Sequence, residues 1–185
     1  CPADYVLKIP SATPIEQASM LKVNPLTAWC MLTQFIDLPK GSWVIQNAAN
    51  SGVGSCIIQI AKLLGLRTIN LVRREELTKT LTDLGADHVL LDEADSIEAI
   101  RAITGDSPPA LALNAVGGDS ALRLMDIIAT KGIHVTPTNR DDGFMNKCFF
   151  FRNWNAHVNK FLNQKCISSR IFINFEPSSI HCWQG

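Results

Sequence analysis

The chain has 185 residues, with 17 basic and 17 acidic side chains that leave a formal net charge of zero at pH 7, and 46% of its residues are hydrophobic. This length and apolar content suit one domain with a sizeable core. The balanced charge, without a basic stripe, argues against nucleic-acid binding, and no apolar run approaches the length of a transmembrane helix.

In chain order, the first expected element is a helix over residues 26–35, with Asn24-Pro25 as a turn before it. The most informative segment follows: Trp43-Val-Ile-Gln-Asn-Ala-Ala-Asn-Ser-Gly-Val-Gly54 runs from an apolar strand pattern into small residues, and an amphipathic helix pattern continues to Gly65. The first N–H groups of a helix have no partner within the helix and attract anions. The segment therefore predicts a strand–turn–helix unit that binds a dinucleotide pyrophosphate.

This turn departs from the glycine fingerprint G-x-G-x-x-G, whose three glycine positions are taken by Ala49, Ser51 and Gly54, with an additional Gly52. Gly54 retains the close helix–strand approach that the third glycine provides. Ala49 is acceptable only where the turn does not need a positive φ, and Ser51 adds a hydroxyl group. Turns of small residues also occur in α/β proteins that bind no nucleotide, so that alternative stays open.

The next strand is expected over Arg67–Val72, and it ends in Arg73-Arg74. An NAD-binding unit usually has an acidic residue at this place for the ribose 2′-hydroxyl, whereas two arginines suit a 2′-phosphate. NADPH is therefore the expected cofactor, although the arginines could also be simply solvated. Glu75 and Glu76 are expected in the first turn of the following helix, with Glu75 four residues before Lys79.

Strands and helices continue to alternate, which predicts a Rossmann-like, doubly wound parallel sheet with helices on both faces. A ligand of such a sheet binds beyond the carboxyl ends of the strands, where Ser51, Arg73 and Gly117 fall. The expected elements are a helix that stops at Gly85, a strand over His88–Leu91, a helix over Ser96–Thr104, a strand over Ala110–Val116, a helix over Asp119–Thr130 and a strand over Ile133–Thr136.

The cysteines and histidines indicate no metal site. No C-x-x-C spacing occurs, and Cys30 and Cys56 lie in apolar helix patterns as small core residues. His88 and His134 adjoin strands and are expected to be structural. The six cysteines are Cys1, Cys30, Cys56, Cys148, Cys166 and Cys182.

Several motifs together resemble the mitochondrial trans-2-enoyl-thioester reductases, of the zinc-independent branch of the medium-chain dehydrogenase/reductase superfamily. The resemblance extends over about residues 9–136. The motifs are Asn24-Pro-Leu-Thr-Ala-Trp29, Gln46-Asn-Ala-Ala-Asn-Ser-Gly-Val-Gly54, Gly65-Leu-Arg-Thr-Ile-Asn70, Leu84-Gly-Ala-Asp-His-Val89 and Leu113-Asn-Ala-Val-Gly-Gly118. It implies that NADPH reduces the 2,3-double bond of an acyl thioester, bound to CoA or acyl carrier protein, in mitochondrial fatty-acid synthesis.

Residue by residue, the resemblance implies cofactor contacts for seven positions. Asn24 would lie near the nicotinamide, the turn would surround the pyrophosphate, and the two arginines would hold the 2′-phosphate. Asn50 could instead cap the following helix through its side-chain oxygen. The implied cofactor-binding residues are Asn24, Asn50, Ser51, Gly52, Val53, Arg73 and Arg74.

The resemblance also sets expectations for the ends of the chain. In the family, a catalytic domain largely N-terminal to the Rossmann unit supplies a tyrosine that helps to protonate the substrate, and Tyr5, the only tyrosine here, does not match it. We expect residues 1–23 to be a remnant of that domain, 24–139 to be the NADP-binding domain, and 140–185 to be a divergent tail with a possible strand near 170–175. Pro137-Thr138-Asn139 replaces the Tyr-Gly-Gly turn of the family. A homodimer is implied for the family.

Three functional hypotheses remain open from the sequence. The favoured one is the cofactor-binding part of a mitochondrial NADPH-dependent enoyl-thioester reductase, which is not expected to turn over substrate alone. A quinone-reductase-like NADPH oxidoreductase of the same superfamily is the second. A truncated isoform without catalytic activity is the third.

Overall fold

The computed structural model describes residue 9 and residues 11–21 and 23–136. Its centre is a sheet of five strands in the order β3-β2-β1-β4-β5. Every pairing in this sheet is parallel, which confirms the doubly wound arrangement expected from the alternation of strands and helices. The strands are β1 (Trp43–Gln46), β2 (Arg67–Val72), β3 (His88–Leu91), β4 (Leu111–Leu113) and β5 (Ile133–Val135).

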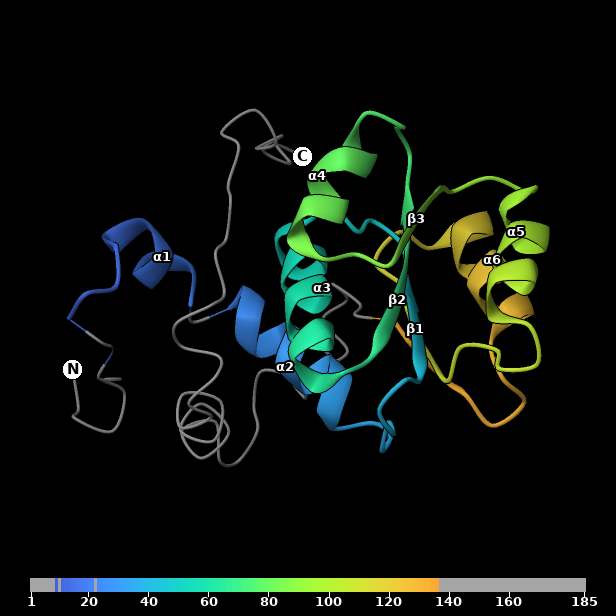
Figure 1. Ribbon diagram of the computed structural model, residues 1–185, viewed down its shortest axis with the longest axis horizontal. Coiled ribbons are helices and arrows are strands. Elements are labelled where there is room, and N and C mark those ends of the chain that lie inside the picture. Colours follow the sequence, from blue (N-terminus) through green and yellow to red (C-terminus); the bar gives the residue numbers. More distant parts are fainter. Residues whose placement is uncertain (1–8, 10, 22, 137–185) are drawn as a thin grey trace.

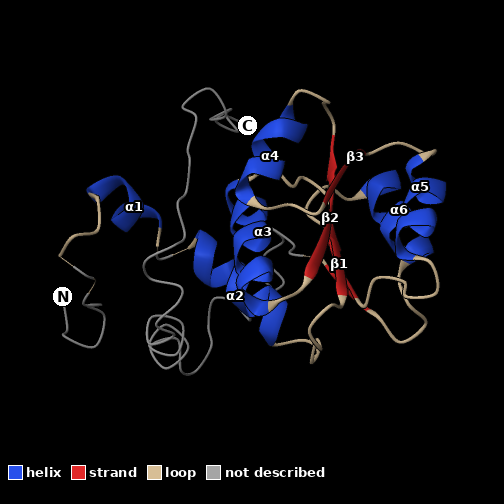
Figure 2. Ribbon diagram, in the orientation of Figure 1, coloured by secondary structure: helices blue, strands red, loops and turns tan. Residues whose placement is uncertain are grey.

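Helices cover both faces of the sheet (Figure 1). One face carries α2 (Asn24–Thr33), α3 (Gly52–Leu64) and α4 (Leu77–Leu84), and the other carries α5 (Ser96–Thr104) and α6 (Gly118–Ile127). Figure 2 shows the strands edge-on between these two helical layers. Upstream of them, α1 (Ile15–Met20) has no buried residue.

Alternation along the strands divides the core into the two layers. Val44 of β1 packs with residues of α2 and α3, whereas its neighbours Trp43 and Ile45 pack with residues of α5 and α6. Successive side chains of a strand point to opposite faces, so one strand serves both cores. This arrangement explains why the strands read as nearly continuous apolar runs.

Several element boundaries differ from the prediction by a few residues, and three of the differences have a clear local reason. The helix expected over 26–35 begins at Asn24, because Pro25 fits the first turn of a helix, where no N–H donor is needed. The strand expected to reach Val116 ends at Leu113, because the side-chain oxygen of Asn114 accepts the N–H groups of Val116 and Gly117 and turns the chain. The last helix ends at Ile127, since Ile128 is extended.

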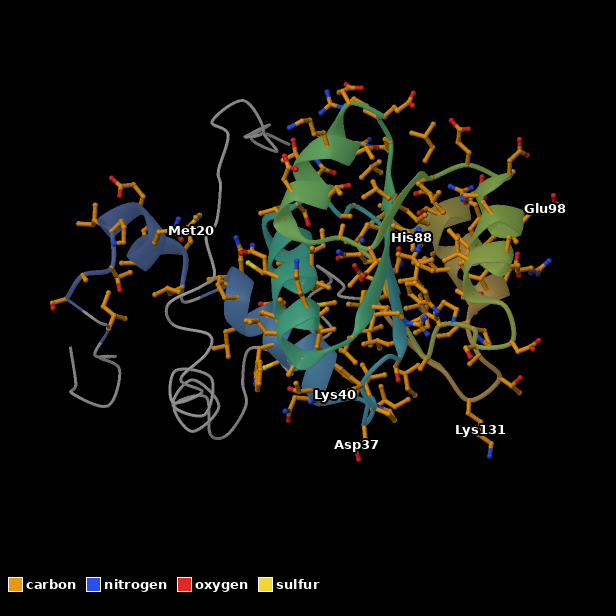
Figure 3. All side chains as sticks on the ribbon, in the orientation of Figure 1. Met20, Asp37, Lys40, His88, Glu98 and Lys131 are labelled. Carbon is orange, nitrogen blue, oxygen red and sulfur yellow. The ribbon has the colours of Figure 1, made fainter. Side chains whose placement is uncertain are left out.

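Cys30 and Cys56 are core residues as predicted, and the ring of His88 makes a packing contact. Cys30 and Cys56 are buried in the core between α2, α3 and the sheet. His88 packs its ring against Trp43, with ring centroids 5.6 Å apart. In Figure 3, His88 lies among the strands, while Glu98 projects from α5 toward the outside. These two cysteines and His88 thus act in packing.

Other predictions fall outside the described residues: Tyr5, the segment 137–139, the tail over 140–185 with its strand near 170–175, and Cys1, Cys148, Cys166 and Cys182. Of the helices that the structure does describe, none combines the length and the apolar character required to cross a bilayer.

Gly54 is predicted to be needed for stability, because a Cβ atom there would lie 2.6 Å from the carbonyl oxygen of Ala49, a backbone atom that cannot move aside. We expect Gly54→Ala to lower the free energy of unfolding by about 1–3 kcal/mol. Gly52→Ala is the matched control in the same helical turn, since its Cβ would meet only the end of the Asn24 side chain. Urea denaturation should show a clear loss for the first variant alone; equal effects would contradict the close approach.

Burial raises the pKa of the Cys56 thiol from 9.0 to about 12. The unfolded chain therefore ionises first, so the contribution of this group to stability is complete below pH 9 and is lost as the pH rises toward 12. We expect the free energy of unfolding to fall more steeply between pH 9 and 10.5 in the wild type than in Cys56→Ala, by up to about 1.4 kcal/mol per pH unit. Parallel slopes in the two proteins would contradict this.

Candidate cofactor-binding site

The turn between β1 and α3 is compact, and its strained residue, Ala48, comes directly before Ala49, the first fingerprint position. Ala48 has φ of 47°, the one positive φ among the non-glycine residues of the described region. Ala49 itself does not have a positive φ, so alanine is acceptable at this fingerprint position. The N–H of Ser51 donates to the carbonyl of Ala48 at 2.9 Å and closes the turn.

Ser51 caps α3. Its hydroxyl oxygen accepts the N–H of Gly54 at 3.1 Å, which is the geometry of a helix N-cap. The alternative that Asn50 caps the helix is thus wrong, and Asn50 is exposed on the turn. Within the described region, the N–H groups of Gly52 and Val53 have no hydrogen-bond acceptor. They are the free donors that the start of a helix offers to an anion.

Asn24 approaches the same turn from the start of α2. A Cβ atom at position 52 would lie 2.5 Å from Asn24 Nδ2, so this approach depends on a glycine there. The structure thereby brings Asn24 of α2 together with Ser51, Gly52 and Val53 at the start of α3, which lie 27 or more positions later in the sequence.

A cavity of about 360 Å³ opens beside this turn. It lies beyond the carboxyl ends of β1 and β4, where the strand order reverses from β3-β2-β1 to β4-β5. Open α/β sheets bind their ligands at this switch point. The cavity is lined by Val23, Asn24, Thr27, Met31, Gln46, Asn47, Ser51, Val53, Gly54, Ile57, Leu113, Asn114 and Ala115.

Arg73 and Arg74 lie apart from this cavity, directly after β2 on the other side of β1. Both are exposed, and Arg74 Nε is 3.6 Å from Glu76 Oε1. The first turn of α4 contains no acidic residue, so the placement expected for Glu75 and Glu76 is wrong.

Lys79 does not need Glu75 as an ion-pair partner, because its Nζ is 3.2 Å from Asp83 Oδ2. The two arginines directly follow β2 and are exposed, so their guanidinium groups are accessible to an anion.

Sequence reasoning missed a buried amide pair that supports the turn from below. Gln46, the last residue of β1, donates through Nε2 to the carbonyl of Gly54 at 3.0 Å and to Asn70 Oδ1 at 2.8 Å. Asn70 in turn donates to Thr68 Oγ1 and to the carbonyl of His88. The available signal was the presence of amides inside otherwise apolar strands, since buried amides must be hydrogen-bonded.

A second polar group was also missed. Asn47 and Asn114 directly follow β1 and β4, and Asn47 Nδ2 donates to Asn114 Oδ1 at 2.7 Å and to Ser120 Oγ at 2.8 Å. The side-chain oxygen of Asn47 accepts the N–H of Ala115 at 2.6 Å. Both asparagines stand in motifs of the sequence, but only the register of β1 against β4 brings them into contact.

The donor set of this site matches a dinucleotide phosphate better than a metal ion. In the part of the chain that the structure describes, no group of three or more His, Cys, Asp or Glu side chains could hold a metal. The turn offers backbone N–H groups and a hydroxyl, and the neighbouring strand end offers two arginines. Such donors recognise phosphate oxygens.

A comparison with protein families matches residues 52–137 to the zinc-binding dehydrogenases. Among curated proteins, the human mitochondrial enoyl-[acyl-carrier-protein] reductase is 46% identical over 138 residues, which is 72% of this chain and 37% of that protein. The Caenorhabditis elegans enzyme of the same name is 41% identical over 140 residues, or 72% of this chain and 40% of that protein. The chain thus spans about two fifths of the length of the curated relatives it matches.

Solved structures agree with these relatives. The mitochondrial 2-enoyl thioester reductase Etr1p/Etr2p heterodimer from Candida tropicalis matches with a TM-score of 0.70 and 26% identity, over 82% of this chain and 50% of that one. The complex of Etr1p with NADP and crotonyl-CoA matches with a TM-score of 0.70 and 28% identity, over 84% of this chain and 50% of that one.

A quinone oxidoreductase from Pseudomonas syringae is also similar, with a TM-score of 0.67 and 25% identity over 78% of this chain and 47% of that one. Enoyl reductases and quinone oxidoreductases thus share this backbone fold, so the fold does not distinguish the two classes. The curated relatives named above are enoyl reductases. Over the matched residues, this chain is a homologue of the mitochondrial enoyl-[acyl-carrier-protein] reductases and has their Rossmann-like fold.

Proposed function

We propose that this chain is the cofactor-binding part of a mitochondrial NADPH-dependent enoyl-thioester reductase. The observation that carries the proposal is the convergence of Ser51, the free N–H groups of α3 and Asn24 around a cavity at the switch point of the sheet. The identity of 40–47% to curated mitochondrial enoyl-[acyl-carrier-protein] reductases supports the reaction class and the location. Because the chain spans only part of those relatives, the activity belongs to the whole protein.

The proposed binding mode follows the carboxyl edge of the sheet. Arg73 and Arg74 hold the 2′-phosphate, and the N–H groups of Gly52 and Val53, together with the Ser51 hydroxyl, hold the pyrophosphate. Asn50 and Asn24 complete the set, with Asn24 facing the cavity. The order of the strands then directs the nicotinamide half toward the ends of β1 and β4.

When bound, NADPH would supply the hydride for reduction of the 2,3-double bond of an acyl thioester, and a proton would complete the saturated product. The residues of this chain bind and orient. The turn and the arginines fix the two phosphate-bearing parts, and the cavity wall excludes water from the reacting face. The acyl thioester carried by CoA or acyl carrier protein is the proposed substrate, in keeping with the crotonyl-CoA complex of Etr1p.

The domain boundaries and the assembly are further parts of the proposal. Residues 24–139 are the NADP-binding domain, residues 1–23 are a remnant of the catalytic domain with a connecting segment, and residues 140–185 are a divergent tail. The whole protein pairs as a dimer, in keeping with the heterodimer of Etr1p and Etr2p. The quinone-reductase alternative is not favoured, because the curated relatives are enoyl reductases.

Titration of the purified chain with NADPH and with NADH, followed by nucleotide fluorescence, tests the proposal directly. Tighter binding of NADPH, with thermal stabilisation of the chain, is the expected result. Failure of the folded chain to bind either nucleotide would overturn the proposal.

The two arginines are expected to select the phosphorylated cofactor. Arg73→Asp combined with Arg74→Ser should weaken NADPH binding by about 3 kcal/mol, on the order of a hundredfold, and NADH binding far less, because two charge-assisted contacts to phosphate are lost. Arg101→Asp combined with Lys131→Ser, at exposed positions away from the site, lowers the net charge by the same three units and is the control. Equal loss for both nucleotides in calorimetric titrations would show that the arginines do not recognise the 2′-phosphate.

Ser51→Asp should weaken NADPH and NADH alike without unfolding the chain. Aspartate also caps a helix, so the contact to the Gly54 N–H is kept, but its negative charge repels the pyrophosphate. Ser51→Asn is the matched control, because asparagine has the same shape and caps α3 without the charge. Unchanged NADPH affinity in Ser51→Asp would show that the pyrophosphate does not lie at this turn.

A further inference from the structure

A buried ion pair lies behind the cavity, on the side of the sheet covered by α6. Asp92 directly follows β3, and its Oδ1 accepts from Arg123 Nε at 2.9 Å and from Arg123 Nη2 at 2.7 Å. The Asp92 side chain is 6% exposed and that of Arg123 is 20% exposed. The Arg123 guanidinium also donates to the Asp92 carbonyl. A carboxylate this deeply buried needs such partners, so its position is tightly defined.

Ser120 connects Asp92 to Asn47, which lies at the carboxyl edge of the sheet. Its hydroxyl donates to the second Asp92 oxygen, Oδ2. Since a carboxylate can only accept, the Ser120 hydrogen is committed to it, and the Ser120 oxygen is left to accept from Asn47 Nδ2 at 2.8 Å. This contact settles which way the Asn47 amide is turned.

With its amide so turned, Asn47 holds the loop after β4. Nδ2 reaches Asn114 Oδ1 at 2.7 Å, and the Asn47 Oδ1 accepts the Ala115 N–H at 2.6 Å. The same Asn114 oxygen accepts the N–H groups of Val116 at 3.1 Å and Gly117 at 3.0 Å. Every backbone N–H from residue 115 to 117 is thus bound to one of the two asparagines.

This network supports one end of the site and not the other. Asn47, Asn114 and Ala115 line the cavity beside β1 and β4, whereas Arg73 and Arg74 follow β2, on the opposite side of β1. None of the hydrogen bonds of the network involves the β2–α4 segment. The arginine end therefore receives no side-chain hydrogen bond from the network; the link between the two ends runs through the backbone, where the Asp92 N–H donates to the Val72 carbonyl at 2.8 Å.

We propose that Ser120 is a positioning residue, which acts through Asn47 to hold the loop 114–117 in the shape that receives the nicotinamide half of the cofactor. The inference rests on the proposed function, because it assumes the direction of the dinucleotide along the carboxyl edge. The proposed phosphate ligands, which are Arg73, Arg74 and the donors of residues 51–53, make none of the side-chain hydrogen bonds of this network. Loss of the Ser120 hydroxyl should then affect only ligands that carry nicotinamide.

The test compares NADPH with 2′-phospho-ADP-ribose, which has the same 2′-phosphate and pyrophosphate but lacks nicotinamide. In Ser120→Ala, we expect the dissociation constant of NADPH to rise about tenfold, as for loss of one or two buried hydrogen bonds, and that of 2′-phospho-ADP-ribose to change less than about twofold. Ser120→Thr retains the hydroxyl and should restore NADPH binding. Asp126→Asn, an exposed change on the same helix, is the control.

The outcomes separate this inference from the proposed function. If the wild-type chain binds neither ligand, the proposed function fails and the inference fails with it. If the wild type binds both ligands but Ser120→Ala weakens both equally, or neither, only the positioning role is overturned. Should Ser120→Ala not fold, Ser120→Cys, which keeps the size and a weak donor, must show the same selective loss of NADPH affinity, and an unselective loss there overturns the role.

Discussion

The arrangement of the site depends on one close contact, between the first turn of α3 and the backbone of the turn that precedes it. A Cβ atom at Gly54 would collide with the Ala49 carbonyl, and Gln46 at the end of β1 holds the Gly54 carbonyl from the sheet side. This contact aims the start of α3 at the carboxyl edge of the sheet. The Ser51 cap and the free N–H groups of Gly52 and Val53 owe their positions to it.

Around that contact, the two helical layers have different tasks. The layer of α2 and α3 brings Asn24 against Gly52 and forms the cavity wall together with β1 and β4. In the other layer, α6 carries Ser120 and Arg123. Arg123 is hydrogen-bonded to Asp92, and Ser120 is hydrogen-bonded to both Asp92 and Asn47 at the carboxyl edge of the sheet. Polar groups inside a protein are tolerated only in satisfied networks, and here the network stabilises the loop beside the cavity.

The separation of the site into two ends agrees with the chemistry proposed for it. Phosphate groups need charge and backbone donors, which the β1–α3 turn and the arginines after β2 provide with little shaping of a pocket. A nicotinamide ring needs a shaped cavity in addition, because its orientation decides where the hydride is delivered. The curated relatives that the chain matches are enoyl-[acyl-carrier-protein] reductases, while the shared backbone of a quinone oxidoreductase shows that the fold by itself does not select the substrate.

The sequence by itself determined the elements, the parallel sheet, the turn at Ser51–Gly54 and the resemblance to the enoyl reductases, because these follow from local periodicity and from contiguous motifs. It also located the arginines at the end of β2. Only the tertiary structure decided that Ser51 rather than Asn50 caps α3, that Glu75 and Glu76 precede α4, and that Asn47, Asn114, Ser120 and Asp92 form one network. The contacts of that network join residues up to 73 positions apart, and the register of β1 against β4 brings Asn47 and Asn114 together, which no local pattern contains.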